Sequence, residues 1–229
     1  MTVTTVVFDL DGTLIDTAPD LIRATNHVLS QAGLAPVPGH ELRPHISFGS
    51  RRMIQRGLEI NGRAVVQDEL DGMFHGLLAY YADNIAVDSR PYPHLETVLD
   101  GLAARGVRLA VCTNKMERHS RKLLCALGLA TRFAAICGRD TFAVCKPDPG
   151  HLTGAIAQAG GDPRRAVMVG DSDTDVATAR AAGIPVIGVS FGYSDVPMRV
   201  LRPDALIDHY QEFGAALDKL ANRCAPPRA

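Results

Sequence analysis

The sequence lacks the patterns that mark several classes of site. Its cysteines include no Cys-x-x-Cys pair, and its histidines show no metal-ligand spacing, so neither residue type indicates a metal centre. The number of cysteines is odd, and three of them lie in or beside apolar runs, which is typical of reduced, mostly buried thiols in a cytosolic protein. The five are Cys112, Cys125, Cys137, Cys145 and Cys224.

Other absences concern membranes and nucleic acids. No apolar run reaches the roughly 18 residues that a membrane helix needs, and the N-terminus has no basic start of the kind found in secretory signals. The net charge is -1, so no nucleic-acid surface is indicated. We therefore expect a cytoplasmic protein without a nucleic-acid or membrane partner. We also expect it to be a monomer or a homodimer.

The pattern that is present predicts an α/β core. With 229 residues, 46% of them apolar, the chain can bury a substantial core. After a first strand at 3–8, helices and strands alternate from residue 95 onward, which predicts a parallel, Rossmann-like sheet with helices on both faces. The expected helices are 95–105, 116–127, 149–159 and 174–182, and the expected later strands are 107–112, 134–137, 166–169, 185–189 and 205–207.

Residues 17–87 interrupt this alternation. Helices are expected at 20–31, 50–60 and 68–83, with no strand between them. The sequence therefore predicts a small all-helical cap (16–87) inserted after the first strand of a core formed by 1–15 and 88–229. Such an insertion can close over a site at the strand ends. The tail 224–229 is expected to be frayed.

Two aspartates follow the first strand, in the segment Phe8-Asp9-Leu10-Asp11-Gly12. Residues alternate sides along a strand, so Asp9 and Asp11 are expected to point the same way. Two carboxylates held that close repel each other unless a cation or a shared proton intervenes. Asp and Gly after a strand are also common turn formers, which is the alternative interpretation.

Three further polar segments follow predicted strands, at the edge where open parallel sheets bind ligands. They are Thr113-Asn114-Lys115, Lys146-Pro147 and Gly170-Asp171-Ser172-Asp173-Thr174-Asp175. Each has an ordinary explanation by itself, as a helix cap, a surface lysine or a turn. The last also mimics a calcium loop, but that loop needs Gly and Glu where this chain has Val176 and Ala182.

Together and in this order, the four segments resemble the signature of the haloacid dehalogenase-like hydrolase superfamily, and the resemblance covers essentially the whole chain. Within the superfamily, the stretches 9–17, 146–149, 170–183 and 188–193 are most similar to the phosphoglycolate phosphatases. The resemblance implies a phosphoric monoester hydrolase that converts 2-phosphoglycolate to glycolate and phosphate.

The resemblance also implies roles for the first and last segments. Asp9 would be the nucleophile and form an aspartyl-phosphate. Asp11 would protonate the leaving oxygen and then deprotonate water. Asp9, the backbone carbonyl of Asp11, and Asp171 would hold Mg²⁺, which suits a site that offers only oxygen ligands.

The remaining roles concern the phosphoryl group. The Thr113 hydroxyl and the Asn114 backbone would bind its oxygens, and Lys146 would neutralise charge near Asp9. Asp175 lies one helical turn after Asp171 and would orient Lys146 or a metal-bound water. Asp173 is expected to have a structural role.

Alternative functions differ in the residues they require. A receiver domain also phosphorylates an aspartate, but it needs no cap, and an acid at Asp11 favours hydrolysis. The superfamily's dehalogenases lack this second acid. Its phosphonate hydrolases use a cap lysine, and the four lysines here all lie outside the cap. A phosphosugar phosphatase or mutase remains the open alternative, because no residue of the sequence decides against it.

The cap carries arginines near Gly49-Ser50 that could bind a substrate carboxylate. The helix 50–60 is expected to begin with Ser50 as its cap, which puts Arg51 at its start. By similarity to related caps, Arg51 is the residue expected to contact substrate. The others in the stretch are Arg43, Arg52 and Arg56.

Overall fold

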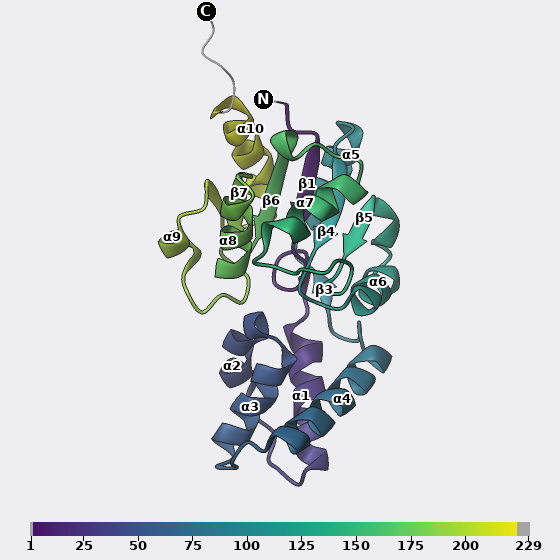
Figure 1. Ribbon diagram of the computed structural model, residues 1–229, viewed down its shortest axis with the longest axis vertical. Coiled ribbons are helices and arrows are strands. Elements are labelled where there is room, and N and C mark those ends of the chain that lie inside the picture. Colours follow the sequence, from purple (N-terminus) through teal and green to yellow (C-terminus); the bar gives the residue numbers. More distant parts are fainter. Residues whose placement is uncertain (1, 224–229) are drawn as a thin grey trace, which may run out of the picture. The chain divides into compact units, whose positions relative to one another are not determined.

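The computed structural model describes residues 2–223, so Cys224 and the predicted frayed tail lie outside the described residues. The chain forms two compact units (Figure 1): an α/β unit of Met1–Ile15 with Pro91–Ala229, and a helical unit of Asp16–Arg90. No helix in the described part of the chain is long and apolar enough to cross a membrane.

The α/β unit is built on a six-stranded sheet of order β5-β4-β1-β6-β7-β8, and every pair of neighbouring strands is parallel. The predicted fold class is therefore confirmed. The strands are β1 (Thr5–Phe8), β4 (Arg108–Cys112), β5 (Ala135–Cys137), β6 (Ala166–Gly170), β7 (Val186–Val189) and β8 (Ala205–Ile207).

Helices cover both faces of this sheet. On one face Val7 belongs to a buried cluster with Leu152 of α7 and Val176 of α8. On the other, Phe8 stacks on Phe213 of α10 with 6.0 Å between ring centroids, as the alternation of side chains along β1 requires. The helices are α5 (Leu95–Ala104), α6 (Glu117–Ala126), α7 (Pro149–Gln158), α8 (Asp173–Ala181), α9 (Met198–Leu201) and α10 (Phe213–Arg223).

The register of the central strands places the polar segments at one edge. Phe8, the last residue of β1, pairs with Val111 of β4 and with Val169 of β6. The residues that follow these three positions therefore leave the sheet at the same height. This is the carboxyl edge beside the strand where the sheet order reverses, which is the usual ligand position in open parallel sheets.

The helical unit contains α1 (Ala18–Gln31), α2 (Gly39–Leu42), the 3₁₀ turn η1 (Arg43–Phe48), α3 (Ser50–Ile60) and α4 (Gln67–Asp83). The buried Asp20 ties the start of α1 to the end of the unit, because it accepts hydrogen bonds from the Asp88 N–H and from the N–H and hydroxyl of Ser89. The chain enters this unit through β2 (Ile15–Asp16) and leaves it through β3 (Arg90–Pro91), and β2 and β3 form a two-stranded sheet.

The short helices α2 and α9 were not predicted, and two further local features differ from the sequence-based expectation. Ser50 is the first residue of α3, not its cap; the cap position is Gly49, whose φ of 87° is one that glycine adopts without strain. Helix α10 was not expected at all. Its buried Phe213, Leu217 and Leu220 have helical spacing, but Gly214 in its first turn weakens the local helix signal.

Candidate active site

Asp9 follows β1 and is almost fully buried, with 8% of its surface exposed. Its Oδ1 lies 3.0 Å from Lys146 Nζ and accepts the Leu10 N–H at 2.7 Å. Both contacts involve Oδ1, and no described residue donates a hydrogen bond to Oδ2. Burial raises the pKa of Asp9 to about 6, although Lys146 acts in the opposite direction. One oxygen of this carboxylate is thus anchored while the other remains available.

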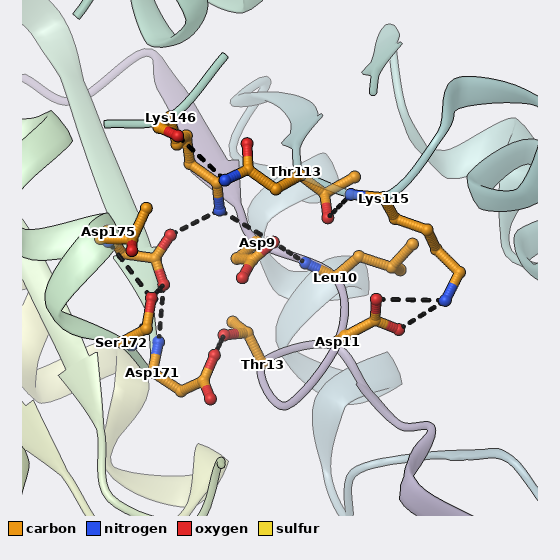
Figure 2. Close-up of polar contacts among 12 residues, drawn as sticks. Asp9, Leu10, Asp11, Thr13, Thr113, Lys115, Lys146, Asp171, Ser172 and Asp175 are labelled. Atoms are coloured by element: carbon orange, nitrogen blue, oxygen red, sulfur yellow. Dashed lines mark hydrogen bonds and ion pairs between the residues drawn. The ribbon is translucent and has the colours of Figure 1, made fainter. Parts of the chain in front are cut away.

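Lys146 lies between two carboxylates (Figure 2), with Nζ 3.0 Å from Asp9 and 2.6 Å from Asp175. Burial by itself would lower the pKa of Lys146, but Asp175 and Asp9 outweigh it and raise the pKa above its usual value. Its backbone is held as well. The N–H donates to His151 Nδ1 at 3.1 Å, and the carbonyl accepts Asn114 Nδ2–H at 2.9 Å. Lys146 is therefore a permanently charged, well-anchored cation beside Asp9.

Asp175 lies in the first turn of α8 and forms a capping box with Ser172. Its Oδ2 accepts the Ser172 hydroxyl at 2.7 Å, the Ser172 N–H at 3.1 Å and the Asp171 N–H at 3.2 Å. Its Oδ1 contacts Lys146. Both oxygens are committed to protein donors, so this residue orients Lys146 and the start of α8.

Asp171 is buried at the end of β6. Its Oδ1 accepts the Thr13 hydroxyl at 2.9 Å and its Oδ2 accepts the Tyr193 N–H at 2.7 Å. Two glycines allow this enclosure: an added Cβ would lie 2.4 Å from Asp171 at Gly12, whose φ is 81°, and 2.2 Å from it at Gly192. Burial and the nearby charges of Asp175 and Asp9 raise the pKa of Asp171 well above its ordinary value.

The three carboxylates form one group that fits a divalent cation. Ligand oxygens of Asp9, Asp171 and Asp175 lie within 4.8 Å of one another. Among the described residues, Lys146 is the cation that contacts this group, so three ionised carboxylates would leave two negative charges uncompensated in a buried place. The donors are all hard oxygens, which suits Mg²⁺. Asp9 and Asp171 are the better ligands. Oδ2 of Asp9 has no donor among the described residues, and each oxygen of Asp171 accepts one neutral donor. Asp175 is more heavily committed, because its Oδ2 accepts three donors and its Oδ1 contacts the Lys146 ammonium.

Asp11 is outside this group. Both its oxygens contact Lys115 Nζ, at 3.0 and 3.1 Å (Figure 2). Strand β1 ends at Phe8, so side-chain alternation does not continue as far as Asp11. Sequence analysis assigned no role to Lys115. The signal in the sequence was that Lys115 belongs to a polar segment after a predicted strand; that this strand, β4, is the neighbour of β1 came from the structure.

Thr113 and Asn114 follow the end of β4 and directly precede Lys115. The Thr113 hydroxyl oxygen accepts the Lys115 N–H at 3.2 Å, which leaves its own proton to donate. The Asn114 side chain bonds Lys146, whereas its backbone N–H donates to no acceptor in the part of the chain that the structure describes. Two donors are therefore available beside Lys146 for an anion.

The remaining candidates lie elsewhere. Asp173 is exposed, and its carboxylate accepts the Thr174 N–H at 2.7 Å, as a structural residue would. Arg51 belongs to the helical unit. Its guanidinium forms an ion pair with Asp71 and lies 4.2 Å from the centre of the Phe74 ring. Three residues that the sequence analysis gave no role also contact residues of the site. They are Thr13, Ser172 and Tyr193.

The geometry agrees with the comparison to known families. Residues 6–189 match the family model described as haloacid dehalogenase-like hydrolase. The chain belongs to this family. It is 47% identical over 220 residues to a phosphoglycolate phosphatase of Mesorhizobium japonicum, covering 96% of this chain and 97% of that protein. It is 45% identical to one of Agrobacterium fabrum, covering 96% and 94%.

A solved structure supports the same assignment. The crystal structure of a predicted phosphoglycolate phosphatase from Haemophilus somnus 129PT superposes with a TM-score of 0.86 at 29% identity, covering 94% of this chain and 98% of that one. The predicted family and the predicted class of enzyme are thereby confirmed: this haloacid dehalogenase-like hydrolase is a phosphatase.

Proposed function

We propose that this phosphatase hydrolyses phosphomonoesters with Mg²⁺ through an aspartyl-phosphate on Asp9. The observation that carries the proposal is the uneven bonding of Asp9. Lys146 and the Leu10 N–H hold Oδ1, and Oδ2 is left as a nucleophile in a buried site next to Asp171. A buried carboxylate that is already oriented suits phosphoryl transfer, because positioning and charge compensation supply most of the catalysis of this reaction.

In the first step, Asp9 Oδ2 attacks phosphorus and the bond from phosphorus to the ester oxygen breaks. Asp11, which must first leave Lys115 and carry a proton, gives that proton to the leaving oxygen. In the second step, Asp11 takes a proton from water as the water attacks phosphorus, and the bond between phosphorus and Asp9 breaks. As these steps proceed, Asp11 would give up its contact with Lys115 and contact first the leaving oxygen and then the water.

The negative charge of the phosphoryl oxygens needs donors throughout. Lys146, the Thr113 hydroxyl and the Asn114 backbone N–H would bind these oxygens. Asp9, the Asp11 carbonyl and Asp171 would hold Mg²⁺, which supplies charge neutralisation at the phosphoryl group. Asp175 would keep Lys146 in place, because its contact with Nζ, at 2.6 Å, is shorter than that of Asp9.

We propose 2-phosphoglycolate as the substrate. The names of the relatives at 45–47% identity support it. The test compares kcat/KM for 2-phosphoglycolate with that for hexose phosphates, while free phosphate and sugar isomers are both assayed. The proposal expects the acid to be preferred and free phosphate to form. A preference for hexose phosphates would favour the sugar phosphatase, and an isomer without free phosphate would favour the mutase.

The helical unit is proposed to act as a cap, with Arg51 recognising the substrate carboxylate. Arg51 lies at the start of α3. Its guanidinium already pairs with one carboxylate, that of Asp71, and lies over the face of the Phe74 ring. Its guanidinium is thus oriented for an acid by packing on an aromatic ring. A substrate carboxylate would share or replace Asp71.

We predict that Arg51→Ala costs about 2–4 kcal/mol of transition-state stabilisation for 2-phosphoglycolate and far less for a neutral aryl phosphate. Arg52→Ala is the matched control, because Arg52 is the next residue and pairs with Glu59 at 2.5 Å. The measured quantity is the ratio of kcat/KM for the two substrates. Asp71→Asn, which frees the Arg51 charge, should not lower that ratio. An unchanged ratio in Arg51→Ala would remove Arg51 from the substrate site.

A further inference from the structure

His151 has no exposed surface and lies in the first turn of α7, five residues after Lys146. Both its ring nitrogens have partners. Nδ1 accepts the Lys146 backbone N–H at 3.1 Å, and Nε2 lies 3.0 Å from the Gly138 carbonyl. A carbonyl can only accept, so Nε2 must carry the proton and Nδ1 must present its lone pair. The two contacts therefore require one tautomer of a neutral ring.

These two bonds join the ends of the loop 139–145. Gly138 follows β5 and precedes the loop, and Lys146 follows the loop. Gly138 is itself pressed against the segment that follows β4, since an added Cβ would lie 2.2 Å from the Glu117 nitrogen. The Arg139 N–H also donates to the Lys115 carbonyl at 3.0 Å. His151 thus ties the Lys146 backbone to a part of the chain that is tightly packed against the Thr113–Lys115 segment.

We propose that His151 is a positioning residue for the phosphatase reaction: its Nδ1 holds the Lys146 backbone so that Nζ lies between Asp9 and Asp175. The proposal rests on the role proposed above for Lys146. A flexible four-carbon side chain carries the ammonium, so a shift of its backbone moves Nζ away from two contacts of 3.0 and 2.6 Å.

The surroundings of His151 favour the state that this role needs. Burial, followed by the charge of Lys146, lowers the pKa of His151 to about 4, so the ring is neutral near pH 7. The edge of the ring packs against Phe142, with 5.9 Å between centroids and planes at 73°. A protonated Nδ1 would turn a donor toward the Lys146 N–H and break the bond.

Two substitutions separate the bonds of His151. In His151→Asn the side-chain oxygen can accept the Lys146 N–H, but the donor to Gly138 is lost. In His151→Gln the amide nitrogen can still donate to Gly138, but the acceptor for Lys146 is lost. Each variant keeps one of the two hydrogen bonds, so a merely structural role predicts similar kcat values for both.

The experiment measures kcat and KM of the full-length, Mg²⁺-loaded protein with an aryl phosphate. We expect His151→Asn to keep kcat within about threefold of wild type, and His151→Gln to lower it by about ten- to a hundredfold at similar KM, because an ångström-scale misplacement can cost that much. Equal kcat values in the two variants would overturn the proposal. So would an NMR spectrum of the wild-type imidazole in which Nδ1 carries a proton.

The variant Lys146→Met separates a failure of the positioning role of His151 from a failure of the proposed role of Lys146. Loss of turnover in this variant together with wild-type kcat in His151→Gln would refute the positioning role alone. Full activity of Lys146→Met would instead remove Lys146 from the reaction, and the role of His151 would fall with it. His151→Leu, which keeps neither bond, is expected to have a kcat no higher than that of His151→Gln if it folds.

Discussion

Asp9→Asn is expected to lower turnover by at least ~10³-fold, because the nucleophile and a metal ligand are lost together. The amide cannot form the acyl phosphate, and its oxygen is a weaker ligand for a divalent cation. The fold should be retained, since the change is nearly isosteric. The same substitution removes one of three clustered carboxylates, of which Lys146 contacts two, so it relieves repulsion and should not lower the melting temperature of the metal-free protein.

The measurement is steady-state turnover of an aryl phosphate by variant protein purified away from host phosphatases, with circular dichroism as the check on folding. Asp173→Asn is the matched control. It makes the same chemical change on exposed Asp173, whose bond from the Thr174 N–H an asparagine can also accept. Asp173→Asn should retain wild-type turnover. Turnover of Asp9→Asn within tenfold of wild type would exclude Asp9 as the nucleophile.

Removal of divalent cations is expected to lower turnover by at least ~10²-fold, since the metal supplies charge stabilisation at the phosphoryl group. Mg²⁺ should restore activity. Ca²⁺ should inhibit, because it accepts more ligands at longer distances and could hold Asp9 through both oxygens, which would occupy the oxygen that attacks phosphorus. The metal should also raise the melting temperature, because it binds only the folded carboxylate group.

Activity in chelator-treated protein, followed as Mg²⁺ or Ca²⁺ is added back, measures this effect. Asp171→Asn should raise the Mg²⁺ concentration needed for half-maximal activity, since it weakens a ligand that Thr13 and Tyr193 hold in place. Full activity in a metal-free preparation would contradict the proposed use of the metal.

Local sequence patterns predicted much of this fold because they depend on neighbours along the chain. The apolar strands, the helix-ending glycines and the alternation after residue 95 each reflect short-range geometry, and the parallel sheet follows from their order. The same logic failed for α10, because Gly214 in its first turn weakens the local helix signal, and the helix is stabilised by a distant contact, that of Phe213 with Phe8. The roles of the site residues remain predictions for the experiments above.

What the sequence determined by itself was the set of polar residues that follow the strands, and therefore the family and the class of chemistry. What only the tertiary structure decided was which of these residues contact one another. Thr13 reaches Asp171 across 158 residues, Lys115 reaches Asp11 across 104, and Lys146 reaches Asp175 across 29. Spacing along the chain cannot specify such pairs, because they depend on strand order and register, which are fixed only when the whole sheet packs.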